Sequence, residues 1–160
     1  MRRVLPWVLL AATVLWCGFI WHFSLASGAE SVQTSGGVTE IVNEILESVG
    51  SESQIAHATV RKMAHFCEFA VLGVLTSLTL LLFRFPHVVP WALLAVFAVG
   101  CVDELLQLTS PDRGPSFLDV LLDTAGGLTG ILLFCGAFLL VCYLRVRNQR
   151  KKSEINEKTS

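Results

Sequence analysis

Charged residues are scarce in this chain, and the long stretches that contain none exclude a water-soluble globular protein. Only 16% of the 160 residues are charged, whereas 53% are hydrophobic, and the mean hydropathy is +0.63. Long uncharged runs indicate membrane spans, because about 20 apolar residues cross a bilayer. The sequence also lacks an internal repeat and any nucleic-acid-binding motif. We therefore expect membrane lipids, and not nucleic acid, as partners.

A disulfide framework is excluded as well. The chain contains five cysteines, an odd number, and each lies inside an apolar stretch. In such a setting cysteine behaves as a small apolar packing residue. These residues are Cys17, Cys67, Cys101, Cys135 and Cys142.

Four hydrophobic stretches predict an all-α, polytopic membrane protein. The first uncharged run, residues 4–29, contains 26 residues and follows two arginines. A cleaved signal peptide is the alternative, but its apolar region is typically only about 7–15 residues long, which favours a retained helix. Turn-rich links separate the other three stretches. The expected transmembrane helices cover residues 4–27, 60–83, 88–108 and 117–144.

Lysine and arginine are absent from residues 28–60, the one long connection, which contains five glutamates. Within it, residues 38–49 place apolar side chains on one helical face and glutamates on the opposite face, which predicts a short amphipathic helix. A surface helix that rests on the other helices is the favoured interpretation. A lid over the polar residues described below is the alternative.

The distribution of basic residues predicts the orientation of the chain. Nine of the twelve basic residues fall on one side of a model with four spans, and basic residues are enriched on the cytoplasmic side. Both termini are therefore expected in the cytoplasm, with residues 1–145 as the membrane domain and residues 146–160 as a basic cytoplasmic tail. The nine are Arg2, Arg3, Arg84, Arg145, Arg147, Arg150, Lys151, Lys152 and Lys158.

Polar residues gather in three short clusters at the predicted outer ends of three spans. The first contains Arg61, Lys62, His65 and Glu68; the second contains Asp103, Glu104 and Gln107; the third contains Arg113, Ser116, Asp119 and Asp123. Charge inside a membrane is costly unless it has a partner, so such groups indicate a functional site. We expect the three clusters to form one pocket.

Spacing along the second span indicates how deep the first cluster lies. Only 15 uncharged residues separate Glu68 from Arg84, which is about 22 Å of helix. A hydrocarbon core is roughly 30 Å thick, so Glu68 is expected below the outer interface. Glu68 and Asp103 are accordingly expected within about 4 Å of a basic nitrogen of Arg61, Lys62 or Arg113.

Helical spacing adds two expectations for the fourth span. Asp119 and Asp123 are four residues apart and share a face, which is unfavourable unless a cation lies nearby or one carboxyl is protonated. Gly126 and Gly130 form a small-xxx-small pair, a pattern that lets membrane helices approach closely.

At the three polar clusters the chain resembles the VanZ-like family of small bacterial membrane proteins, named for a teicoplanin-resistance determinant. The matching segments are R-K-x-x-H-F-x-E-F at residues 61–69, D-E-x-x-Q at residues 103–107 and R-x-x-S-x-x-D at residues 113–119. The resemblance covers residues 5–145. Phe69 stands where the family commonly has tyrosine, Asp123 stands where asparagine is common, and Ser24 is the candidate for a serine usual near the end of the first span.

The resemblance implies a multi-pass protein of the bacterial cytoplasmic membrane with a role in lowered susceptibility to lipoglycopeptide antibiotics. It does not supply the molecular activity, the substrate or a cofactor. The residues themselves leave several functions open, and whether the protein is an enzyme is one of the open questions.

In the first alternative the pocket recognises an amphiphile, such as a lipid-linked envelope precursor or a lipid-tailed antibiotic. Arginine suits bidentate contact with phosphate or carboxylate. The expected binding residues are Arg61, Lys62, Gln107, Arg113, Ser116 and Asp123.

In the second alternative the pocket is catalytic. His65 or Glu68 acts as a general base, and Asp103, Glu104 or Asp119 orients it. A metal-dependent version uses His65, Glu68, Asp103 and Asp119 as ligands. In the third alternative the polar network only fixes helix packing. A channel or transporter is less favoured, because the clusters occupy only one half of the membrane.

Overall fold

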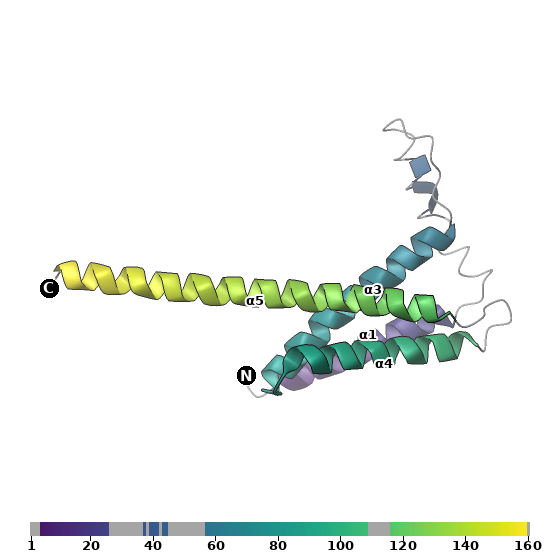
Figure 1. The fold of residues 1–160 in the computed structure, drawn as a ribbon, viewed down its shortest axis with the longest axis horizontal. Coiled ribbons are helices and arrows are strands. Elements are labelled where there is room, and N and C mark those ends of the chain that lie inside the picture. Colours follow the sequence, from purple (N-terminus) through teal and green to yellow (C-terminus); the bar gives the residue numbers. More distant parts are fainter. Residues whose placement is uncertain are drawn as a thin grey trace.

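The fold is a small bundle of helices, as a computed structural model shows (Figure 1). The structure describes residues 4–25, 37, 39–41, 43, 44, 57–108 and 116–159. Its helices are α1 (Leu5–Ser24), α3 (His57–Leu82), α4 (Val88–Gln107) and α5 (Phe117–Thr159). All four are long and apolar enough to cross a membrane. The described residues contain no strand, so the expectation of an all-α membrane protein with four spanning helices is confirmed.

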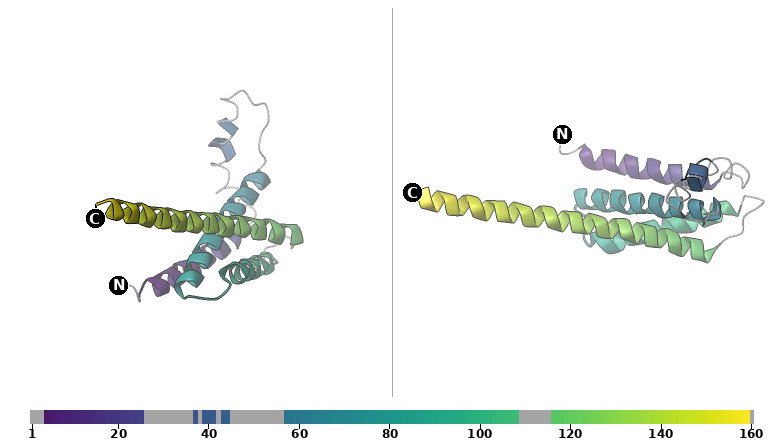
Figure 2. Two further views of the ribbon diagram at one scale, coloured as in Figure 1. Left: turned by 60° about the vertical axis from the view of Figure 1, so that its left-hand side comes forward. Right: turned by 90° about the horizontal axis from the view of Figure 1, so that it is seen from above.

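Helix α3 lies at the centre of the bundle and contacts α1, α4 and α5. It crosses α5 obliquely (Figure 1). The start of α1 and the end of α5 lie at the same end of the bundle (Figure 1 and Figure 2). The starts of α3 and α5 and the end of α4 lie at the opposite end. Because these three helix ends carry the polar clusters, the fold brings the clusters together.

Apolar side chains cover the outside of the bundle. Leu15, Leu118 and Phe117 are 74%, 72% and 69% exposed. In water this surface would be unfavourable, whereas lipid tails are as apolar as these side chains. The buried apolar core is correspondingly small, and Ile20, Phe69, Leu72 and Val96 form one cluster within it. The bundle is therefore built for lipid on its outer face.

Glycines in α5 allow the close crossing with α3. A Cβ atom at Gly126 would overlap the carbonyl oxygen of Phe66, and one at Gly130 would overlap the carbonyl oxygen of Ala70. Because the obstacles are backbone atoms, they cannot turn aside. The small-xxx-small pair is thus the point at which the two helix backbones meet.

The link between α3 and α4 begins with a helix-ending motif. The Arg84 amide donates to the Leu81 carbonyl oxygen at 3.0 Å, and the Phe85 amide donates to the Leu80 carbonyl oxygen at 2.9 Å. Arg84 has a φ of 57°. This hydrogen-bond pattern with a left-handed residue satisfies the last carbonyls of a helix and ends it sharply.

Two predicted segments differ in extent from the structure or fall partly outside it. Helix α5 continues to Thr159, through the residues expected as a tail. Within the predicted amphipathic helix at 38–49, residues 39–41, 43 and 44 are helical, and the remaining residues lie outside the described part. Thr39 is buried there, whereas Ile41 is 58% exposed. The exposure of Ile41 differs from the predicted packing of the apolar face.

Candidate functional site

The end of α4 contributes the most deeply buried polar side chains of the site. Asp103, Glu104 and Gln107 are 0%, 5% and 7% exposed. Gln107 lies one turn after Asp103, and its Nε2 donates a hydrogen bond of 2.9 Å to Asp103 Oδ2. The other oxygen, Asp103 Oδ1, is buried and accepts no hydrogen bond from the described residues. One side of this carboxylate is therefore held in place, while the other is free to bind a ligand.

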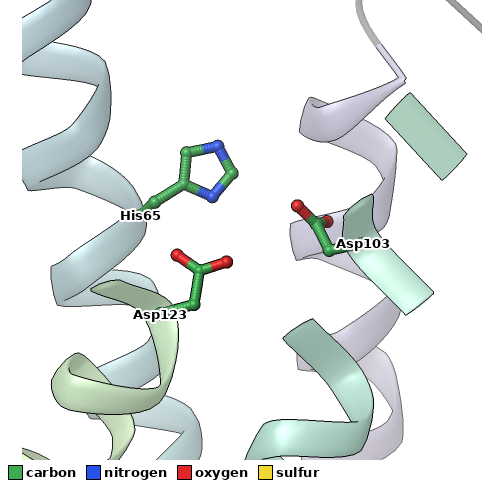
Figure 3. Close-up of side chains that lie close together, drawn as sticks. All are labelled: His65, Asp103 and Asp123. Carbon is green, nitrogen blue, oxygen red and sulfur yellow. The ribbon is translucent and has the colours of Figure 1, made fainter. Parts of the chain in front are cut away.

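Three helices each direct one ionisable side chain toward a common point (Figure 3). His65 comes from α3, Asp103 from α4 and Asp123 from α5. One nitrogen or oxygen atom of each lies within 4.8 Å of the others. Asp123 is only 3% exposed. This arrangement is a possible ligand set for a metal ion, in which Asp123 stands in place of the Glu68 and Asp119 expected from the sequence.

Two ion pairs between described residues flank this point. Lys62 Nζ lies 2.7 Å from Asp119 Oδ1 and joins α3 to α5. Glu68 Oε2 lies 3.8 Å from Nδ1 of His65, which carries charge only when protonated. The Lys62–Asp119 pair joins the first sequence cluster to the third. The His65–Glu68 pair lies within the first cluster.

That Glu68 and Asp103 each lie close to Arg61, Lys62 or Arg113 stays a prediction, although neither carboxylate forms an ion pair with Arg61 or Lys62. Within the described residues, Glu68 pairs with His65 and Asp103 is bound by Gln107. The long flexible stem of Lys62 lets its ammonium group reach Asp119. Arg113, the third expected partner, lies outside the described residues.

Ser116 and Glu104 connect the start of α5 to the end of α4. The Ser116 amide donates to Glu104 Oε2 at 2.8 Å. Ser116 Oγ accepts a hydrogen bond of 3.3 Å from the amide of Asp119, three residues later. This contact is that of a helix N-cap. The Glu104 carboxylate thus binds a backbone N–H that the helix itself leaves unsatisfied.

Two cavities lined by described residues adjoin the site. The smaller one has room for about 10 Å³ and is lined by Arg61, Lys62, His65, Asp119, Leu122 and Asp123. That is about the size of one water molecule. The larger one is an open groove of about 320 Å³ between α4 and α5, lined by Cys101, Glu104, Leu105, Ser116, Phe117 and Val120. Its walls are mainly apolar, with Glu104 as the charged member.

The groove contains residues that were not expected from the sequence. Cys101 and Leu105 are one helical turn apart, and Leu105 adjoins Glu104, so helical spacing could have placed them beside that carboxylate. Phe117 and Val120 lie one and four residues after Ser116, so the same helical spacing could have placed them beside it. The signal is weak, because apolar residues occupy most positions of both spans.

Two residues named in the resemblance lie in the interior. Phe69 is fully buried and belongs to the apolar core, so a phenyl ring fills a position inside the bundle. Ser24 is the last residue of α1 and is also fully buried. Trp16 of the same helix donates from Nε1 to the backbone oxygen of Glu68 at 3.0 Å. Helix α1 therefore packs directly behind the polar residues of α3.

The family of the chain follows from a comparison with known protein families. Comparisons with curated proteins and with solved structures gave no significant match. The model of one family, VanZ/LLP1, matches residues 9–142. That stretch covers most of the four spanning helices and every polar cluster described above. The chain therefore belongs to the VanZ/LLP1 family of membrane proteins, and a role in the cell envelope fits that family.

Proposed function

We propose that this protein binds or modifies an amphiphilic or lipid-linked substrate of the cell envelope. The observation that carries the proposal is a buried polar cluster beside a lipid-facing apolar groove. Glu104, only 5% exposed, lines the groove. Helix α4 places Asp103, which is fully buried, next to it in the sequence. A molecule with a polar head and an apolar tail needs both environments within a short distance.

The groove supports the apolar half of this proposal. Its volume of about 320 Å³ falls in the range of about 300–1,000 Å³ typical of small-molecule sites. Leu105 and Phe117, two of its lining residues, are 63% and 69% exposed. Because these side chains face the lipid, an acyl or prenyl chain can enter the groove from the bilayer.

The basic residues at the start of α3 support the polar half. Lys62 has a side chain that is 50% exposed and pairs with Asp119. Arg61 lines the small cavity beside His65. A phosphate or carboxylate head group would meet two cations there, and arginine offers it two parallel hydrogen bonds. In a catalytic version of the proposal, His65 acts as the general base with Glu68 beside it.

We also propose that the polar end of the bundle faces outward in the bacterial cytoplasmic membrane. The basic residues at 84 and 145–152 lie at the opposite end from the polar clusters. Basic residues are enriched on the cytoplasmic side of membranes. A substrate of the outer leaflet would therefore reach the pocket without crossing the membrane.

The test is lipoglycopeptide susceptibility of a sensitive bacterium that expresses the chain. Arg61→Ala, His65→Ala, Asp103→Asn and Asp119→Asn should each abolish protection at unchanged membrane abundance. Leu133→Ala and Leu139→Ala are the controls, because these α5 side chains are 65% and 66% exposed and should retain protection. Protection that persists in all four pocket variants would disprove the proposal.

The alternative function, a polar network that only fixes helix packing, makes a different prediction for Lys62 and Asp119. These two residues form the ion pair between α3 and α5. If packing is the only role, the double change Lys62→Met with Asp119→Leu should restore both abundance and protection. If the pair serves a substrate, abundance returns and protection does not.

A binding measurement separates recognition from modification. Cell-surface binding of a lipid-tailed and a tail-less glycopeptide is measured with and without the protein. Loss of binding for both drugs indicates chemistry on their envelope target. Altered binding of the lipid-tailed drug alone indicates recognition of the amphiphile.

A further inference from the structure

We propose that His65, Asp103 and Asp123 bind a divalent transition-metal ion, Mn²⁺ or Zn²⁺. The inference deepens the proposed function and rests on it for the site's purpose, because the ion would lie in the same pocket as the substrate. Ion binding itself requires no substrate, so it can be measured separately.

The geometry of the three side chains fits a single ion. Their ligand atoms lie within 4.8 Å of one another. Oxygen and nitrogen ligands lie roughly 2.0–2.6 Å from a divalent ion, so opposite ligands are at most about 4–5 Å apart. The side chains come from three different helices and point toward one shared space (Figure 3). An ion there would be bound by α3, α4 and α5 together.

The hydrogen bonding of Asp103 leaves one oxygen directed at this space. Asp103 is fully buried, and its Oδ1 has no hydrogen-bond partner among the described residues. Gln107 Nε2 holds the other oxygen at 2.9 Å. A second residue that orients a ligating carboxylate is a usual part of a metal site. An apolar environment makes an unpartnered carboxylate oxygen expensive, and a cation removes that cost.

The charge around the point also favours a cation. Asp123 is 3% exposed and makes no ion pair with the described residues, and Glu68 lies next to His65. The ammonium group of Lys62, which lines the same small cavity as His65 and Asp123, is already held by Asp119 at 2.7 Å. Buried carboxylates without a counter-charge repel one another, whereas a divalent ion neutralises two of them.

The donor set indicates which ions fit. Imidazole suits Zn²⁺ and similar transition metals, whereas carboxylates also suit Mn²⁺. One imidazole with two carboxylates therefore favours these ions over Ca²⁺ and Mg²⁺, which prefer oxygen ligands alone. Three protein ligands leave at least one position open, as catalytic zinc sites do. The cavity of about 10 Å³ lined by His65 and Asp123 has room for one water molecule at that position.

The experiment measures metal content and metal affinity of the full chain purified in detergent. Inductively coupled plasma mass spectrometry should find about one equivalent after incubation with Zn²⁺ or Mn²⁺, and calorimetry should give the affinity. Asp103→Asn, Asp123→Asn and His65→Ala should each weaken binding by at least about tenfold, because even the loss of an outer residue costs about 10–100-fold. Gln107→Met, which removes only the orienting residue, should weaken binding less.

Matched controls are available for both kinds of ligand. Glu44→Gln changes an exposed carboxylate between α1 and α3, and His87→Ala changes an exposed histidine in the link between α3 and α4. Both should bind the ion as the unchanged protein does. Size-exclusion profiles and helical circular dichroism show whether each variant is folded. The two asparagine changes keep side-chain volume, so they test the site even if His65→Ala does not fold.

Failure of this inference differs from failure of the proposed function. An unchanged protein that binds no ion up to millimolar Zn²⁺ or Mn²⁺ overturns the metal site, as does equal affinity in all variants. If the pocket variants still lose protection against the drug in that case, the proposed function stands without a metal. If the ion binds as expected but the pocket variants keep protection, the metal site stands and the proposed function fails.

Discussion

At the scale of single residues, burial divides the acidic side chains of the site into two kinds. Asp103 and Asp123 are almost completely buried, and no basic side chain in the described part of the chain pairs with either. Asp119 has a side chain that is 26% exposed and pairs with Lys62, which is 50% exposed. Burial of Asp103 and Asp123 without a counter-charge is energetically costly, and a bound cation would offset that cost. The second kind resembles an ordinary surface ion pair.

This difference predicts a small effect of the Lys62–Asp119 pair on stability. A double-mutant cycle with Lys62→Met and Asp119→Asn should give a coupling of about 1 kcal/mol or less, because exposed ion pairs contribute little. The measurement is thermal unfolding of the purified protein in detergent. A coupling of several kcal/mol would mean that the pair is effectively buried and would favour the purely structural role.

A second residue-scale prediction concerns the N-cap of α5. Ser116→Ala removes the side-chain acceptor of the Asp119 amide and should lower the free energy of unfolding by about 0.5–2 kcal/mol. Ser116→Asp keeps an acceptor at that position, but it also brings a negative charge near Glu104, which already binds the Ser116 amide. We therefore expect Ser116→Asn, which is uncharged, to preserve stability best. Equal stability of the alanine and asparagine variants would contradict the capping role.

The sequence predicts which residues gather at the site better than it predicts which of them contact one another. The clusters of α3, α4 and α5 do meet, since helical spacing puts His65, Asp103 and Asp123 near three adjoining helix ends. Asp119 and Asp123 share one face, so sequence spacing alone cannot decide which of them approaches His65. The crossing of α3 over α5 decides it, and that crossing depends on contacts far apart in the sequence.

At the scale of whole helices, the glycines of α5 set that crossing. Gly130→Ala should destabilise the bundle by about 1–3 kcal/mol, because its Cβ atom would overlap the carbonyl oxygen of Ala70. Gly136→Ala is the control on the same helix, since a Cβ atom there has nothing within 4 Å. It should leave stability unchanged or raise it slightly, because alanine favours helix. Thermal unfolding in detergent measures both.

The comparison of Gly130→Ala with Gly136→Ala tests the geometry of the site as well as stability. If Gly130→Ala and Gly136→Ala unfold at the same temperature, the close approach of α3 and α5 is not real. The geometry that brings Asp123 beside His65 would then lose its support.

Helix positions are the part of the fold that the sequence predicts most directly. Charge-free runs indicate spans, because the bilayer excludes unpaired charge. The end of α5 was harder to predict, since residues 145–159 are polar and yet continue the helix to Thr159. Lysine, arginine and glutamate are good helix formers, so a span can extend into water without a break.

At the scale of the whole molecule, polarity is distributed unevenly along the bundle. One end carries the buried carboxylates and His65, and the other end carries most of the arginines and lysines. Between them, residues 69–83, 88–102 and 124–144 contain no charged side chain. A bilayer imposes this pattern, because its core admits apolar surface and its two faces differ in charge. The site consequently lies near one membrane surface only.

That asymmetry leads to a prediction about topology. Helix α1 begins and α5 ends at one end of the bundle (Figure 1), and nine of the twelve basic residues are expected on that side from the sequence. Alkaline phosphatase, which is active only outside the cytoplasm, should be inactive when fused after Lys152 and active when inserted at Ser35. Green fluorescent protein, as the complementary reporter, should fluoresce after Lys152.

Removal of these positive charges tests the cause of this orientation. Replacing Arg145, Arg147, Arg150, Lys151 and Lys152 with glutamine should weaken the preference, because juxtamembrane arginine and lysine determine which side stays in the cytoplasm. Glutamine keeps the helix propensity of these positions, so the helix itself should persist. An active phosphatase after Lys152 in the unchanged chain would place the carboxyl terminus outside. The pocket of His65, Asp103 and Asp123 would then open toward the cytoplasm, and a substrate of the outer leaflet could not reach it.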